Sequence, residues 1–174
     1  TELGQLLEQE TTTTKTRIVA RGQQVVRIDL EVTTPLPDRA REALLDAALA
    51  AMPGCGAVVL EDYDKGVMDP ALAAALIASA RAQGIPVVVD PKQRHFFGYA
   101  GATVFKPNRR ELEQALGTHF AGDERDLADA RTRLGTDHLL LTLGAEGMVL
   151  VSADAALRRT PSIAREVFDV SGAG

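Results

Sequence analysis

The sequence predicts an α/β fold that is built on a mostly parallel sheet, and two observations lead to this prediction. Short continuous apolar segments, typical of strands buried on both faces, alternate with segments that carry helix start and stop signals. Polar residues follow successive apolar segments, as they do at the carboxyl edge of a parallel sheet. With 174 residues, of which 45% are hydrophobic, the chain is long enough to bury a core.

The amino-terminal residues do not yet follow this alternation. Residues 1–10 resemble the end of an amphipathic helix, with leucines on one side. Four threonines follow without a turn residue, so we expect that a loop is absent between Glu10 and Thr11. Residues 12–31 then predict a β-hairpin with its turn at 21–22.

Cations gather on this hairpin, although the chain has a net charge of −5. Arg17 and Arg21 share a face of the first arm with Lys15 and Val19, and Arg27 lies on the second arm. One interpretation is a solvated edge hairpin whose cations discourage aggregation. The other is a lid whose cations meet a phosphorylated ligand. We expect the hairpin to stand apart from the main sheet and to pair with a second copy as a homodimer.

From residue 35 helices and strands alternate. Helix signals include Asp69 followed by Pro70 at a start, Asn108 at another start, and Gly84 and Gly117 after two ends. The expected helices span 37–52, 69–83, 108–116 and 126–134. The expected strands span 57–60, 86–89, 102–105, 138–143 and 148–151, the last two being an antiparallel pair around a turn at 144–147.

The composition of the chain indicates which kinds of partner it can bind. The acidic balance does not favour nucleic acid, and no apolar run approaches the roughly 18 residues of a membrane span. We also find no signal peptide and expect a small-molecule partner. Cys55 is the only cysteine, which excludes an intrachain disulfide and fits a reducing cytoplasm. Its place before an apolar strand predicts a buried structural thiol.

Polar residues cluster at the ends of the predicted strands, which indicates a crevice for a nucleotide or a phosphosugar. The clusters are 61–66, 90–92, 106–111, 142–147 and the terminal Gly172, Ala173 and Gly174. The terminal residues have almost no side chains, so their N–H groups can approach an anion closely, especially if a helix follows. A plain turn is the alternative for this loop.

These motifs, in this order, resemble those of the ribokinase/PfkB family of carbohydrate kinases. Residues 169–174, Asp-Val-Ser-Gly-Ala-Gly, resemble its second signature, and residues 108–111, Asn-Arg-Arg-Glu, resemble its Asn-x-x-Glu motif. Residues 142–147, Thr-Leu-Gly-Ala-Glu-Gly, resemble its nucleotide-side segment. Within the family, residues 15–29 and 62–66 are similar to D-glycero-β-D-manno-heptose 7-phosphate kinases.

The resemblance implies a three-layer ribokinase-like fold in which residues 1–174 are part of one kinase domain. Residues 12–31 would be its lid and residues 35–174 its nucleotide-side core. The amino-terminal part of the family's fold and its carboxyl-terminal end would be missing. In the family an Asp follows the last glycine as catalytic base, so we expect it just after Gly174. A polypeptide of residues 1–174 alone is therefore expected to be inactive.

The implied reaction is phosphorylation of a sugar phosphate by ATP with Mg²⁺. For the heptose it would occur at the C1 hydroxyl and give the 1,7-bisphosphate, a step in making lipopolysaccharide precursors. Gly172, Ala173 and Gly174 would form the anion hole, with Asp169 beside it, and Glu111 would act on Mg²⁺ through water. The nucleotide would meet Asn108, Arg109, Arg110, Glu111, Thr142, Gly144, Glu146 and Gly147. The sugar phosphate would meet Arg17, Arg21, Arg27, Lys65, Asp90 and Lys92.

Alternatives stay open at this point. Asn108 and Glu111 have the spacing of a capping box, and residues 144–147 are also an ordinary hairpin turn. Asp62 and Asp64 alone are thin evidence for a metal site, and the three histidines have no metal-ligand spacing. A kinase of the same family for another sugar or nucleoside, or a non-catalytic nucleotide- or sugar-binding module, also fits the sequence.

Overall fold

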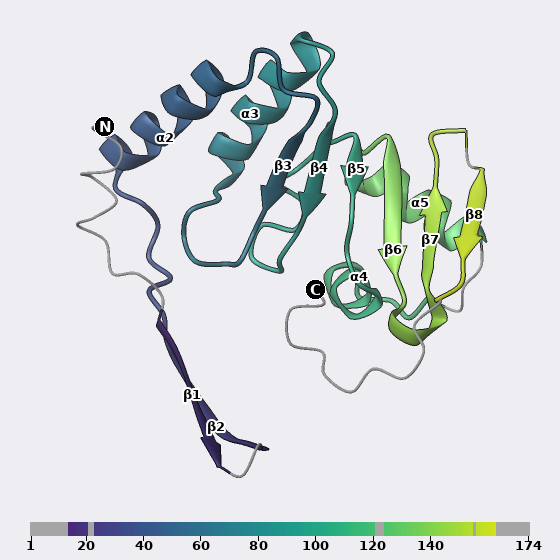
Figure 1. Ribbon diagram of the computed structural model, residues 1–174. Coiled ribbons are helices and arrows are strands. Elements are labelled where there is room, and N and C mark those ends of the chain that lie inside the picture. Colours follow the sequence, from purple (N-terminus) through teal and green to yellow (C-terminus); the bar gives the residue numbers. More distant parts are fainter. Residues whose placement is uncertain (1–13, 21–22, 121–123, 155, 163–174) are drawn as a thin grey trace.

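The computed structural model describes residues 14–20, 23–120, 124–154 and 156–162, which form two separate sheets (Figure 1). A two-stranded sheet pairs β1 (Thr14–Ala20) with β2 (Gln23–Leu30). The other sheet has six strands in the order β3-β4-β5-β6-β7-β8. The helix expected in residues 1–10, the join after Glu10, the turn at 21–22 and the terminal loop lie outside the described residues.

The six-stranded sheet is mixed but mostly parallel, which confirms the predicted α/β class. Strands β3 to β6 run parallel, and β7 and β8 add two antiparallel pairings. The strands are β3 (Val58–Glu61), β4 (Val87–Asp90), β5 (Val104–Phe105), β6 (His138–Thr142), β7 (Met148–Val151) and β8 (Leu157–Thr160).

The helices follow the start and stop signals of the sequence. They are α2 (Asp38–Ala51), α3 (Pro70–Ala82), α4 (Arg109–Leu116) and α5 (Glu124–Leu134), with a 3₁₀ turn η1 at Gly144–Glu146. Asp69 caps α3 by accepting hydrogen bonds from the N–H groups of Ala71 and Leu72, at 2.8 and 2.9 Å. In Figure 1, α2 and α3 lie beside β3 and β4, and α5 lies behind β6 and β7.

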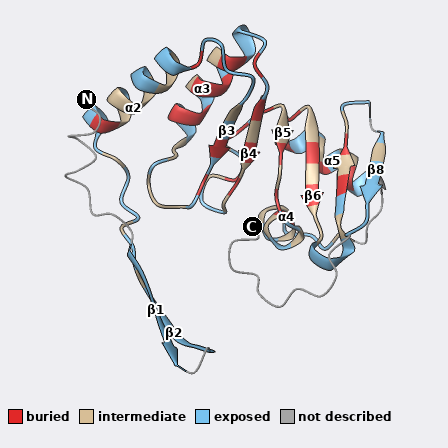
Figure 2. Cartoon of the chain, in the orientation of Figure 1, coloured by how far each residue is buried: buried red, intermediate tan, exposed pale blue. Residues whose placement is uncertain are grey.

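The core runs along the middle of the six-stranded sheet and into α3, as the red segments of Figure 2 show, and it includes buried residues of α5. Phe105 of β5 lies at its centre, with edge-to-face contact to Phe96 at 5.1 Å between ring centroids and a tilted contact to Tyr99. Aliphatic side chains supply most of the rest, because the chain has few aromatic residues. No helix within the described ranges is both long and apolar enough to cross a bilayer.

Three details differ from the sequence prediction. Strand β5 has two residues instead of four, because the Thr103 hydroxyl accepts the Val87 N–H at 2.9 Å in place of a ladder bond. Strand β8 was not predicted, because its Leu-Arg-Arg-Thr sequence does not alternate. The prediction of a buried Cys55 is wrong: the residue is exposed in the turn after α2, and its thiol donates to the Ala51 carbonyl.

The hairpin stands apart from the main sheet, as predicted (Figure 1). Arg17 lies directly opposite Arg27, so these two cations share a face. Simple alternation fails beyond them, because the pairing shifts between Ile18 and Val19, as it does at a β-bulge. Val19 consequently pairs with Gln24. All described residues of both strands are exposed or, at one position, partly exposed.

Candidate active site

The carboxyl ends of β3, β4, β5 and β6 meet along one edge of the sheet. Glu61 and Asp90 are paired at the ends of β3 and β4, and the Asp62 N–H donates to the Asp90 carbonyl at 3.0 Å. Asn108, which follows β5, forms an isolated parallel bridge with Thr142, the last residue of β6. Four of the polar clusters that the sequence predicted therefore lie at adjacent strand ends.

A capping box at the start of α4 fixes Asn108 and Glu111. The Asn108 side chain accepts the Glu111 N–H at 2.8 Å, and Glu111 Oε2 accepts the Asn108 N–H at 2.9 Å. The Glu111 side chain is only 13% exposed. The capping role expected from the spacing is therefore confirmed, and it orients a carboxylate at the edge of the sheet.

A chain of ion pairs connects Glu111 to the ends of β4 and β5. Lys92 Nζ lies 2.7 Å from Glu111 Oε1 and 3.9 Å from Asp90 Oδ1, and Lys106 Nζ lies 2.8 Å from Asp90 Oδ2. Burial alone would lower the pKa of Lys92, but the hydrogen bond to Glu111 and the charges of Glu111, Asp90 and Asp62 outweigh it and raise that pKa. Two cations and two carboxylates thus alternate along the edge.

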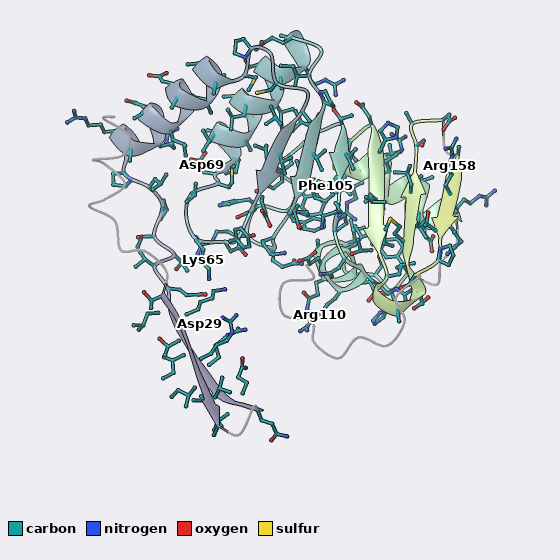
Figure 3. The ribbon with its side chains drawn as sticks, viewed as in Figure 1. Asp29, Lys65, Asp69, Phe105, Arg110 and Arg158 are labelled. Carbon is teal, nitrogen blue, oxygen red and sulfur yellow. The ribbon has the colours of Figure 1, made fainter. Side chains whose placement is uncertain are left out.

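The turn after β6 joins the same edge. Arg109 Nη2 lies 3.1 Å from Glu146 Oε2, and the Thr142 N–H donates to the Pro107 carbonyl at 3.0 Å. Gly147 has φ +91°, and an added Cβ would lie 2.0 Å from the Thr160 carbonyl oxygen, so only glycine fits this position. Gly144 is exposed beside it, and Arg110 is exposed on the first turn of α4 (Figure 3).

A second part of the site lies in the loop after β3. Asp62 is 3% exposed and accepts hydrogen bonds from the Tyr99 hydroxyl at 2.7 Å and from the Asp64 N–H at 2.8 Å. Burial, then the hydrogen bond to Asp62, then the charges of Asp62 and Asp64 raise the pKa of Tyr99. This buried pair fixes the loop to the core.

The same loop connects the sheet to the hairpin. Lys65 forms an ion pair with Glu31 where the hairpin meets the sheet (Figure 3). Gly66 packs so closely against the segment that follows the hairpin that an added Cβ would lie 1.9 Å from the Thr34 carbonyl oxygen. Arg94, from the loop after β4, donates to the Thr33 carbonyl at 3.1 Å. Contacts from two strand ends therefore hold the root of the hairpin.

A cavity of about 620 Å³ opens between the hairpin root and the end of β3. It is lined by Lys15, Glu61, Asp62, Tyr63, Lys65, Val67 and Met68. Its size suits a small polar ligand, and its cations, carboxylates and phenol can bind phosphate and hydroxyl groups. Tyr63 donates to Glu61, and this bond, followed by burial and by the charges of Glu61 and Asp90, raises the pKa of Tyr63.

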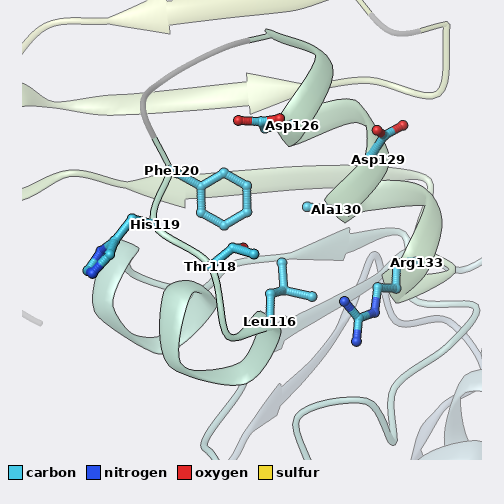
Figure 4. A pocket seen from close by; sticks show the side chains of 8 residues that line it. All are labelled: Leu116, Thr118, His119, Phe120, Asp126, Asp129, Ala130 and Arg133. Atoms are coloured by element: carbon cyan, nitrogen blue, oxygen red, sulfur yellow. The ribbon is translucent and has the colours of Figure 1, made fainter.

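A smaller pocket of about 300 Å³ lies between the end of α4 and α5 (Figure 4). It is lined by Leu116, Thr118, His119, Phe120, Asp126, Asp129, Ala130 and Arg133. None of these lining residues belongs to the strand-end clusters that the sequence predicted. We therefore locate the candidate site at the strand ends and in the cavity beside the hairpin.

The structure brings together most of the predicted site residues. Asn108, Arg109, Glu111, Thr142 and Glu146 are connected, and Asp90 and Lys92, expected on the sugar side, contact this same group. Arg17 and Arg27 remain on the hairpin, and Arg27 pairs with Asp29 at 3.1 Å. Arg21, Asp169, Gly172, Ala173 and Gly174 lie outside the described residues.

Sequence reasoning did not assign several residues that the structure adds to the site. Lys106 and Arg94 stand close in sequence to assigned residues, and the polar clusters at 90–92 and 106–111 were the available signal. Lys15 was noted only as one of the hairpin cations, and it lines the cavity. Tyr99 had no signal, because its contact with Asp62 spans 37 positions.

The residues present fit a magnesium ion that arrives with a nucleotide. Within the described part of the chain, no group of three or more His, Cys, Asp or Glu side chains is arranged to hold a metal. Mg²⁺ commonly keeps several waters and uses only one or two carboxylates together with substrate phosphates. Glu111 and Asp90, both near this edge, supply that limited donor set.

The comparisons first define the class of protein. Among solved structures of about 17–20% identity, the fold is similar to Escherichia coli phosphofructokinase-2 in its tetrameric inhibited form, with TM-score 0.72 over 93% of this chain and 54% of that chain. It is also similar to an Arabidopsis thaliana ribokinase complexed with ribose and ATP, with TM-score 0.60 over 88% and 49% of the two chains. The fold is therefore that of the ribokinase-like kinases.

The family model for the pfkB family of carbohydrate kinases matches residues 4–174, so the chain belongs to this family. Among curated proteins, the Bifunctional protein HldE of Azorhizobium caulinodans is 47% identical over 165 residues, which is 94% of this chain and 34% of that protein. The protein of the same name from Rhodospirillum rubrum is 45% identical over 166 residues. The chain thus spans about a third of the length of these relatives.

Proposed function

We propose that this chain is the nucleotide-side part of a kinase that transfers a phosphoryl group from ATP to D-glycero-β-D-manno-heptose 7-phosphate. The acceptor is the C1 hydroxyl, and the product is the 1,7-bisphosphate, a lipopolysaccharide precursor. Support comes from the family match, from relatives named HldE at 43–47% identity, and from the geometry of the sheet edge. A cytoplasmic location follows from the use of ATP.

One observation carries the proposal: the cavity beside the hairpin adjoins the charged network on the nucleotide side. The Asp62 N–H donates to the Asp90 carbonyl at 3.0 Å, so a residue that lines the cavity contacts the residue that pairs with Lys92 and Lys106. An acceptor in the cavity at the end of β3 would then face a nucleotide phosphate at the end of the neighbouring strand β4. Such positioning of two reactants supplies much of phosphoryl-transfer catalysis.

On the nucleotide side, each residue has a definite task. Asn108 and Arg109 would orient phosphate oxygens, and the turn of Gly144 and Gly147 would lie against the nucleotide, with Thr142 and Glu146 bracing it. Arg110, exposed on α4, would screen the phosphates. Mg²⁺, when bound with ATP, neutralises phosphate charge, and Glu111 would hold one of its waters.

On the sugar side, Lys15 and Lys65 would bind the existing phosphate, because both line the cavity. Arg17 and Arg27 lie directly opposite each other, and a bound anion would relieve their repulsion when the hairpin closes. Arg21 would be a further cation for this phosphate. The anion hole would come from Gly172, Ala173 and Gly174 next to Asp169. In this proposal residues 12–31 are the lid and residues 35–174 the core.

We further propose that the hairpin forms a homodimer. One of its faces exposes apolar side chains: Ile18, Val26, Ile28 and Leu30 are 42–66% exposed. An isolated two-stranded hairpin is only marginally stable, and exposed apolar rows mark association surfaces. A second hairpin, packed face to face, would cover both rows.

The test is a substrate panel with the natural full-length protein, ATP and Mg²⁺. Acceptors would include heptose 7-phosphate, unphosphorylated heptose, and hexose 6-phosphates with one carbon fewer. We expect ADP formation that depends on heptose 7-phosphate. Its kcat/KM should be at least about tenfold above the kcat/KM for each of the other acceptors. Preference for an unphosphorylated sugar or a nucleoside would overturn the substrate assignment.

A further inference from the structure

Each carboxylate oxygen of Glu111 accepts a hydrogen bond in this structure. Oε1 accepts from Lys92 at 2.7 Å, and Oε2 accepts the Asn108 N–H at 2.9 Å. A divalent cation that approaches Glu111 through a water would be repelled by the Lys92 ammonium, which lies 2.7 Å from Oε1. The Asn108 N–H belongs to the helix cap, and its loss would expose the start of α4. The Lys92 ammonium sits on a flexible stem and is the donor that can move.

The charges around Lys92 explain why it stays in place before a nucleotide arrives. Asp62, Asp90 and Glu111 all act on it, and Lys106 is bound to Asp90 at 2.8 Å. Three carboxylates and two ammonium groups leave a net charge of −1, by simple count over these five side chains. This excess of one carboxylate among the five side chains would attract a divalent cation.

We propose that Lys92 exchanges partners: its ammonium holds Glu111 in the nucleotide-free protein, and moves to a nucleotide phosphate when magnesium nucleotide binds. Asp90 guides the movement, because its Oδ1 lies 3.9 Å from Lys92 while Lys106 holds its Oδ2. The released Glu111 carboxylate then faces the cation's water. Binding of magnesium and binding of the nucleotide phosphate thus each favour the other. This inference rests on the proposed function.

The substitution Lys92→Met tests both contacts of the exchange, the one with Glu111 and the one with the nucleotide phosphate. Without its ammonium, Glu111 and Asp90 are more negative, so the nucleotide-free protein should bind a divalent cation roughly fivefold to tenfold more tightly. The same change removes a phosphate contact, so affinity for magnesium ADP should fall by a similar factor. A purely structural role of Lys92 would not move the two affinities in opposite directions.

The measurements use the natural full-length protein. Mn²⁺ alone is titrated by electron paramagnetic resonance, and magnesium ADP by calorimetry. The control is Arg158→Met, which removes one cation from exposed β8 (Figure 3) and should leave both affinities within about twofold. Affinities that fall together, or that both stay unchanged in Lys92→Met, would overturn the exchange.

A structure of the wild-type protein with Mg²⁺ and a non-hydrolysable ATP analogue gives a test that needs no variant. Lys92 Nζ should lie beyond about 4 Å from the Glu111 carboxylate and within hydrogen-bond distance of a phosphate oxygen. An intact Lys92–Glu111 pair in that complex would overturn the inference while leaving the kinase function standing. A wild-type protein that binds no magnesium nucleotide would instead overturn the proposed function.

Discussion

At the scale of single residues, the candidate site contains side chains that serve the fold and would also serve the proposed chemistry. Glu111 completes a helix cap and forms an ion pair with Lys92 through its two separate oxygens. Asp62 is buried, and both of its oxygens accept hydrogen bonds. Each oxygen of these two carboxylates has its own hydrogen-bond partner. A substitution that removes one partner or one charge should therefore affect catalysis and stability to different extents.

Glu111→Gln in the full-length protein should lower kcat much more than it weakens ATP binding. Glutamine keeps the capping geometry, so α4 should remain intact, while the charge that holds the water on Mg²⁺ is lost. Outer-shell ligands of this kind contribute about 10- to 100-fold to activity. Steady-state kinetics at saturating Mg²⁺ measures the effect, and an unchanged kcat would exclude this role.

Tyr99→Phe should lower the free energy of unfolding by about 1–3 kcal/mol at pH 7, because Asp62 Oδ2 would lose its buried donor. The pKa of Tyr99 is raised above its ordinary value of 10.0, so its contribution is complete below pH 10 and falls as the unfolded tyrosine ionises above it. The difference between wild type and variant should therefore shrink above about pH 10. Urea unfolding at pH 7 and pH 10.5 measures it, and a difference that grows with pH would contradict the account.

At the scale of elements, the strand ends are the organising feature, and the loops after β3 and β4 reach the root of the hairpin. Lys65 pairs with Glu31, the Gly66 carbonyl accepts the Leu36 N–H at 3.1 Å, and Arg94 binds the Thr33 carbonyl. The hairpin root is thereby connected to the loop that carries Lys92. Movement of the hairpin would therefore displace this loop and with it Lys92, which we propose for the nucleotide side.

Gly66→Ala should destabilise the protein more than Gly84→Ala does. Both glycines have positive φ, +81° and +70°, so both substitutions strain the backbone by roughly 1 kcal/mol. At Gly84 a Cβ meets no atom within 4 Å, whereas at Gly66 it would lie 1.9 Å from the Thr34 oxygen. The urea midpoints of the two variants measure how much stability the close approach at Gly66 accounts for. Equal decreases in the two variants would show that this contact does not contribute to stability.

The sequence predicted most of the elements, because their signals are local. Asp69, Asn108 and Gly117 mark helix ends, and their capping geometry is present in the structure. What the sequence could not predict depends on contacts between distant segments. The shortening of β5 comes from a bond between Thr103 and Val87, and the register shift after Ile18 needs both strands of the hairpin. The capping box was expected, but its ion pair with Lys92 depends on the order of β4 and β5 in the sheet.

At the scale of the whole molecule, two sheets divide the proposed tasks. The six-stranded sheet carries on one edge the residues that we propose for the nucleotide side, and the separate hairpin would carry the cations that face the sugar phosphate (Figure 1). The cavity lies where the two meet, lined by Lys15 from the hairpin and Lys65 from the sheet side. Closure of the hairpin would complete the sugar side.

The association proposed for the hairpin is testable on the full-length protein by light scattering during size-exclusion chromatography. Ile28→Lys places a charge in the exposed apolar row and should convert a dimer into a monomer. Val25→Lys is the matched control, because Val25 is 65% exposed but lies at the register shift, outside that row. A wild-type protein that is monomeric at tens of micromolar would contradict the dimer.

The central claim is phosphoryl transfer from ATP to the anomeric hydroxyl of heptose 7-phosphate. Phosphorus NMR of a reaction with the full-length protein, ATP, Mg²⁺ and D-glycero-β-D-manno-heptose 7-phosphate tests it most directly. The account predicts one new sugar phosphate signal, coupled to the anomeric proton, that grows in equal amount with ADP while the 7-phosphate signal persists. Absence of sugar-dependent ADP, or a new phosphate on a hydroxyl other than C1, would contradict it.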